Sequence, residues 1–153
     1  MERKTPVNRF DGVRALLTVG SFEFFGPALR DMGPSHATNP DWVGHARLHM
    51  VWTIVLMVAL GILDLALVFR GRGTSREEGN LRLAGALQLA NLAAFWTAWL
   101  TAPLYGGAIV IEQHSQVLGI NENTLVFILL SGVFGVSASL FVSRSRKDAA
   151  VLA

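Results

Sequence analysis

Long apolar stretches separated by short polar segments run along this chain, and they predict four helices. No charged residue occurs between positions 83 and 111 or between positions 123 and 143. A run of about 20 apolar residues is long enough to cross the roughly 30 Å hydrocarbon core of a bilayer as a helix. The pattern therefore predicts an all-α integral membrane protein, with residues 1–153 forming a single four-helix bundle.

Local signals place the ends of these helices. The predicted spans are about 10–29, 40–69, 78–102 and 123–142. The first is the least hydrophobic, whereas the second has clear start signals, with Asn39 as N-cap and Pro40 as the first helical residue. Pro103 stops the third helix, and Asn121 or Asn123 can cap the fourth.

Composition supports a membrane protein and excludes several kinds of chemistry. Hydrophobic residues make up 52% of the chain and charged residues only 16%, whereas a soluble domain has about 25% charged residues. The chain has no cysteine, which excludes disulfides, thiolate nucleophiles and cysteine-based zinc or iron–sulfur sites. No short apolar stretch with a cleavage site follows the basic N-terminus, so we expect no cleaved signal peptide.

Basic residues are distributed unevenly, and this predicts the orientation. Eleven of the 13 Lys and Arg residues fall in the N-terminal stretch, the region 70–82 and the C-terminal tail, and only Arg30 and Arg47 fall on the other side. The positive-inside rule then places both termini in the cytoplasm and predicts a multi-pass protein of the cell inner membrane. This asymmetry explains the pI of about 9.7, so we expect the lipid bilayer and not nucleic acid as a partner. The loop 70–77 is expected to be a tight inner turn without a phosphate cradle.

The predicted orientation places all four histidines in the outer half: His36, His45, His49 and His114. His45 and His49 are four residues apart and share a helix face, so they can bind a metal. They do not form the zinc motif HExxH, because Ala46 occupies the position of the glutamate. Alternatively, His45 faces the headgroups and His49 is a hydrogen-bonded core residue. His36 or His114 could supply a third ligand.

Two carboxylates, Glu23 and Asp64, lie well inside the predicted helices, where an ionisable group is costly and is a functional candidate. Glu23 lies among apolar residues on the outer half. It could donate a proton, bind a histidine or pair with Arg30. Asp64 is nearer the inner side, and we expect it to pair with Arg14.

Amides and tryptophans complete the candidate residues. Gln88 and Asn91 are expected to form hydrogen bonds between helices, a common use of amides in membranes. The four tryptophans are expected to form an aromatic belt or to pack between helices: Trp42, Trp52, Trp96 and Trp99.

Four short stretches, in their order and spacing, resemble the styrene oxide isomerase family of small four-helix membrane proteins. They are GSFE at 20–23, ARLH at 46–49, RLAG at 82–85 and SRSRK at 143–147. The resemblance implies a trimer that holds haem b between adjacent subunits, with His49 as the axial ligand of the iron. It also implies that the open iron position acts as a Lewis acid on an epoxide oxygen. Three positions differ from the family pattern: Val55 replaces an Asn, Asn91 an Asp and Trp99 a Tyr.

The resemblance therefore implies a haem-b-dependent isomerase that converts a small lipophilic epoxide to a carbonyl compound in the membrane. The expected catalytic residues are Asn91, Trp99 and Glu23, and the expected haem-binding residues are His49, His45 and Trp52. One alternative is a haem-free, acid-catalysed lipid isomerase similar to the emopamil-binding sterol isomerases, in which Glu23 and His49 exchange protons. Another is a non-catalytic haem or quinone binder or an assembly subunit.

Overall fold

The computed structural model describes residues 8–108, 116–117 and 119–152, with side chains described as far as residue 146. The described helices are α1 (Asp11–Gly20), α2 (Phe22–Arg30), α3 (Gly44–Phe69), α4 (Glu77–Thr101) and α5 (Glu122–Leu152). A short 3-10 turn, η1 (Ala102–Leu104), follows α4. Strands β1 (Gln116–Val117) and β2 (Ile120–Asn121) pair as an antiparallel hairpin before α5. The prediction of an all-α chain is confirmed, apart from this small hairpin.

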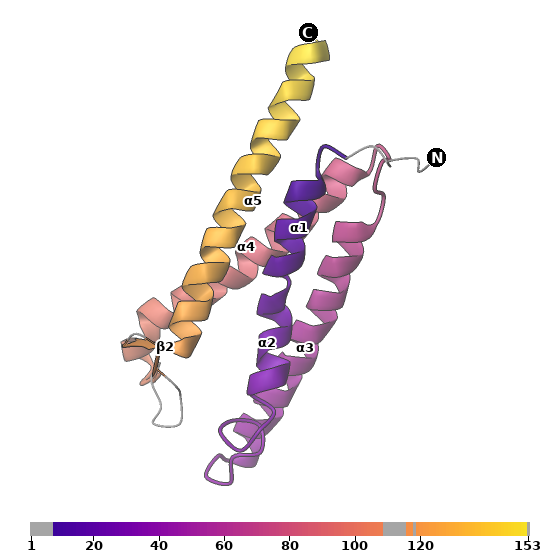
Figure 1. Cartoon of the computed structure of the whole chain (residues 1–153). Coiled ribbons are helices and arrows are strands. Elements are labelled where there is room, and N and C mark those ends of the chain that lie inside the picture. Colours follow the sequence, from indigo (N-terminus) through magenta and orange to yellow (C-terminus); the bar gives the residue numbers. More distant parts are fainter. Residues whose placement is uncertain (1–7, 109–115, 118, 153) are drawn as a thin grey trace.

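α1 and α2 run in the same direction from one end of the molecule toward the other, and α3, α4 and α5 then reverse direction in turn (Figure 1). α2 packs along α3, α5 packs along α1, and α4 packs against both α3 and α5. The start of α1, the turn between α3 and α4 and the end of α5 lie at one end, which we call the basic end. The opposite end carries the start of α3 with its histidines, and we call it the histidine end.

The first predicted helix is divided into two. Helical bonding continues to the Ser21 amide, which donates to the Leu17 carbonyl at 2.9 Å, and restarts where the Phe24 amide donates to the Ser21 carbonyl at 3.1 Å. Pro27 lies inside α2 and has no N–H to donate. With 10 and 9 residues, α1 and α2 are each too short to cross a bilayer. Three segments of the described chain are long and apolar enough to do so: 44–69, 77–104 and 122–146.

Helix α3 begins at Gly44, so the predicted start at Pro40 is wrong. The Asn39 side-chain oxygen accepts from the Asp41 amide at 2.9 Å, and the Asn39 carbonyl accepts from the Trp42 amide. These bonds close a local turn, which is the competing use of an Asn side chain. The helix therefore begins only after this turn.

α4 begins and ends close to its predicted limits, and α5 begins close to its predicted start. Pro103 falls in η1, directly after α4. At α5 the Asn121 side-chain oxygen accepts from the Asn123 amide at 3.0 Å, which confirms Asn121 as a capping residue. α5 continues well past its predicted end at Val142.

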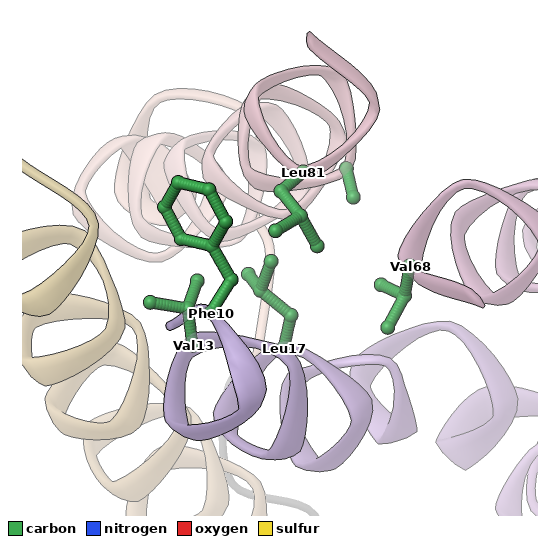
Figure 2. Packing of buried hydrophobic residues seen from close by; sticks show 6 residues of the cluster. Phe10, Val13, Leu17, Val68 and Leu81 are labelled. Atoms are coloured by element: carbon green, nitrogen blue, oxygen red, sulfur yellow. The ribbon is translucent and has the colours of Figure 1, made fainter. Parts of the chain in front are cut away.

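The core lies toward the basic end of the bundle. Phe10 and the α1 residues Val13 and Leu17 group with Val68 of α3 and Leu81 of α4 (Figure 2). Each of these five side chains is at most 3% exposed. The core therefore fixes α1 against α3 and α4.

Candidate functional site

An ion pair closes the basic end of the bundle. Arg14, which is 6% exposed, pairs with the Glu77 carboxylate and donates to the Val68 carbonyl. Glu77 also accepts from the Asn8 side chain at 2.9 Å and from the Gly73 amide at 2.8 Å. The expected pair between Arg14 and Asp64 is therefore wrong, because Glu77 at the start of α4 takes the guanidinium.

Asp64 instead joins three helices in the middle of the bundle. It is completely buried, and its Oδ2 accepts from Ser21 Oγ at 2.7 Å and from Gln88 Nε2 at 2.8 Å. Gln88 Nε2 also donates to the Leu17 carbonyl at 2.8 Å, which confirms its predicted role between helices. A Cβ at Gly20 would overlap the Gln88 side chain, so this contact needs a glycine. The break at Ser21 is thus the point where α1 meets the Asp64 network.

On α2 and α4, three polar atoms further toward the histidine end are buried without a hydrogen-bond partner in the described part of the chain. They are Glu23 Oε1, Asn91 Nδ2 and Trp99 Nε1. Glu23 is 3% exposed, and Asn91 lies beside it. Asn91 and Trp99 are eight residues apart and lie near the same side of α4. Leaving such a group unpaired costs about 1–3 kcal/mol. Of the three residues, only Glu23 lines a cavity described below.

A cavity of about 430 Å³ adjoins Glu23 between α2, α4 and α5. We call it the Glu23 cavity. It is lined by Phe22, Glu23, Gly26, Pro27, Arg30, Asp31, Phe95, Glu122, Asn123, Val126, Phe127 and Leu130. The rings of Phe95 and Phe127 are parallel, with centroids 3.5 Å apart. Arg30 Nε donates to Glu122 Oε1 at 2.9 Å and joins α2 to α5. The lining combines apolar and aromatic side chains with five charged or polar ones, and a concave site with both kinds of group can hold a small molecule.

His45 and His49 lie on an exposed face of α3. Their Nε2 atoms are 3.0 Å apart, and the His49 ring lies 5.7 Å from that of Trp52. The next residues on this face, Leu56 and Leu63, are about half exposed. We call the five residues the histidine stripe. His49 is exposed, so the alternative of a buried core histidine is wrong.

The structure divides the candidate residues predicted for the outer half into two groups. The buried residues of α3 are Ile54, Gly61, Asp64 and Val68, and they lie on the side of the helix away from the histidine stripe. Glu23 and Asn91 face the bundle interior, whereas His49 faces outward. One chain therefore brings Glu23, Asn91 and Trp99 to the interior but does not bring His49 to them.

The remaining histidines do not complete a metal site in the part of the chain that the structure describes. His36 lies in the turn before α3, where Nδ1 is 3.0 Å from Ser35 Oγ and 3.6 Å from Asp31 Oδ1. Its ring packs edge-on against Trp42. His114 lies outside the described residues. Among described residues, no group of three or more His, Asp or Glu side chains is placed to hold a metal ion.

Two features of the site were missed from the sequence. The first is Ser21, whose role depends on the helix break that turns it toward Asp64. The second is the ion pair between Arg30 and Glu122, which are 92 residues apart. Arg30 had been considered only as a partner of Glu23. No local pattern marks either contact.

Comparisons with known proteins give no match: no family model, no curated protein and no solved structure is significantly similar to this chain. The class of protein is therefore defined by fold and site alone. The described part of this all-α chain has three helices long and apolar enough to cross a membrane. It carries a cavity with a buried carboxyl group in its wall and, elsewhere, an exposed histidine pair.

Proposed function

We propose that this chain is a membrane-embedded isomerase that binds haem b through His49 and opens a small lipophilic epoxide to a carbonyl compound. The resemblance of its GSFE, ARLH, RLAG and SRSRK stretches to the styrene oxide isomerases supports this function. The structural observation that carries it is the exposure of His49 on a helix apolar enough to cross a membrane. An imidazole facing outward from such a helix needs a partner there, since polar groups in a membrane are costly.

The residues around His49 fit a haem held between subunits better than one enclosed by a single chain. The Glu23 cavity does not include His49. Its neighbours Leu48, Trp52 and Leu56 are exposed and apolar, and they offer a surface for one face of a macrocycle. A second copy would have to cover the other face, which is consistent with the proposed trimer.

The chain's own residues would have defined tasks at this surface. His49 Nε2 would bind the iron, and it would then give up its contact with His45 Nε2. His45 would remain one turn away, and Trp52 would exclude water beside the ligand. Bound ferric haem would supply a Lewis acid for an epoxide oxygen.

An absorption spectrum tests this proposal. We expect purified protein supplemented with haem to show a Soret band that His49→Ala removes. His36→Ala is the matched control, because His36 lies in the turn before α3, and it should keep the band. The absence of a Soret band in the wild type, or an unchanged band in His49→Ala, would overturn the proposal.

The Glu23 cavity favours a second candidate, a haem-free isomerase that works by acid catalysis. Glu23 is buried in the wall of an aromatic-lined cavity and has an unpartnered oxygen, so it is placed to exchange a proton with a bound molecule. Asn91 lies beside Glu23 and would orient its carboxyl group. His49 faces away and would have no part in this reaction.

Haem dependence separates the two candidates. Haem-free protein can be assayed with an aryl epoxide and with an unsaturated sterol as probes. Full activity that is lost in Glu23→Gln would favour acid catalysis. Activity that requires added haem and survives Glu23→Gln would exclude it.

We also propose that both termini are cytoplasmic and that α1 and α2 together make the fourth pass through the cell inner membrane. The basic end would then be the inner end, in agreement with the positive-inside rule. Reporter fusions test this topology. A reporter inserted at residues 71–75 that reads as external would reverse it.

A further inference from the structure

The turn between α3 and α4 is held in one conformation by its own hydrogen bonds. Gly71 and Gly73 have φ values of 76° and 73°, a region that favours glycine. Thr74 Oγ donates to the Gly71 carbonyl at 2.7 Å, and Asn80 Nδ2 donates to the Arg70 carbonyl at 2.9 Å. The side chains of this turn therefore project from a backbone of fixed conformation.

A cavity of about 620 Å³, open to the surface, lies against this turn, which the sequence predicted to be tight and without a phosphate cradle. It is lined by Arg70, Gly71, Thr74, Ser75, Arg76 and Asn80. The lining includes two guanidinium groups, two hydroxyls and an amide, but no carboxylate. This is the chemistry of a site for a phosphate group.

Nearby carboxylates do not neutralise these two arginines. Glu77 is occupied by Arg14, the Asn8 side chain and the Gly73 amide. Glu78 pairs with Arg82 and Arg9. Within the described part of the chain, Arg70 and Arg76 form no ion pair. Their positive charge is therefore available to an anion.

We propose that this cavity binds the phosphate group of an anionic phospholipid, with Arg70 and Arg76 pairing with its oxygens. The cavity lies where α3 ends and α4 begins, and both helices are long and apolar enough to cross a membrane. Phe69, directly before the turn, is 56% exposed and offers an apolar contact to an acyl chain. A phospholipid satisfies both features, whereas free phosphate satisfies only the charge. This site is separate from the proposed haem and substrate sites.

The chain provides a matched control for this site. Arg72 lies in the same turn but pairs with Asp11 at 3.0 Å and does not line the cavity. Arg70→Gln/Arg76→Gln and Arg72→Gln can therefore be compared in the full chain. All three positions are exposed, so we expect each variant to fold, and thermal midpoints in phosphatidylcholine nanodiscs will verify this.

The measurement is the affinity of the purified protein for short-chain phosphatidylglycerol, with short-chain phosphatidylcholine and inorganic phosphate as the other arms. We expect Arg70→Gln/Arg76→Gln to lower the affinity for phosphatidylglycerol about tenfold or more, at roughly 1 kcal/mol per arginine. Arg72→Gln should stay within about twofold of wild type.

Two outcomes would overturn the proposal. An equal loss in Arg72→Gln would show diffuse attraction to basic charge and not a site. Equal affinity for inorganic phosphate and phosphatidylglycerol would assign the cavity to free phosphate and exclude the lipid.

Discussion

The two sides of α3 show how one apolar helix can handle polar residues in different ways. On the inner side, Asp64 is completely buried and accepts hydrogen bonds from α4 and from the residue between α1 and α2. On the outer side, His45 and His49 are exposed and contact each other and Trp52. Two donors of the chain bind Oδ2 of the inner carboxyl group, whereas the histidines of the outer pair contact only each other and Trp52. This difference separates groups that stabilise the fold from groups that are available for binding.

The largest effect on stability is expected at the ion pair between Arg14 and Glu77, which closes the basic end of the bundle. Arg14→Leu should lower the free energy of unfolding by about 3–5 kcal/mol, because it leaves the Glu77 carboxylate buried without its cation. Thermal or denaturant unfolding in detergent micelles would measure this loss. Arg72→Gln breaks an exposed pair and should cost at most about 1 kcal/mol. Equal losses in the two variants would contradict the importance of the buried pair.

The next largest effect on stability is expected where α2 packs closely against α3. A Cβ at Gly61 would lie 2.7 Å from the Phe25 ring and 2.9 Å from Phe24, so Gly61→Ala should destabilise the protein by about 1–3 kcal/mol. Gly132→Ala is the matched control in α5, where a Cβ meets nothing within 4 Å. It should leave stability unchanged or raise it slightly. If Gly61→Ala behaved like Gly132→Ala, the packing of α2 on α3 would be looser than described.

The Asp64 network should contribute a similar or smaller amount. Asp64→Leu removes the acceptor for Ser21 and Gln88, and we expect a loss of about 1–3 kcal/mol. Asp64→Asn keeps an acceptor oxygen and should lose less. The order of the two unfolding midpoints is the test. A more stable Asp64→Leu variant would mean that the carboxyl group is retained for function at a cost to stability.

Substitutions on the outer side of α3 should have little effect on the free energy of unfolding. Trp52 is 63% exposed, so Trp52→Ala should change the free energy of unfolding by no more than about 0.5 kcal/mol in monomeric, haem-free protein. The same variant should weaken haem binding, because Trp52 lies beside His49. A large loss of stability without haem would instead make Trp52 part of the packed fold.

The sequence predicted the helices well, because long charge-free runs and the signals at Pro103 and Asn121 are local. It could not predict which side of α3 is packed. This helix is apolar around most of its circumference, so periodicity does not distinguish a packed side from an exposed one. The break at Ser21 and the start at Gly44 were also missed, because each depends on side-chain bonds that compete with helix formation.

The candidate site was predicted as a set of residues but not as an arrangement. Glu23 and Asn91 were both candidates, and the structure brings them together in the interior. The sequence places His49 in the same outer half as Glu23, but the structure directs the two side chains to opposite sides. The depth of a residue in the bundle follows from its position in the sequence. The side of the helix that faces the interior depends on which neighbouring helices pack against it.

Chemical rescue of His49 tests the central proposal most directly. In His49→Gly, we expect the Soret band of haem-supplemented protein to be lost and to return when free imidazole is added. The Trp52 ring beside this position should help to hold the added imidazole. A His49→Gly protein that keeps the wild-type band without imidazole would contradict the assignment of His49 as the iron ligand.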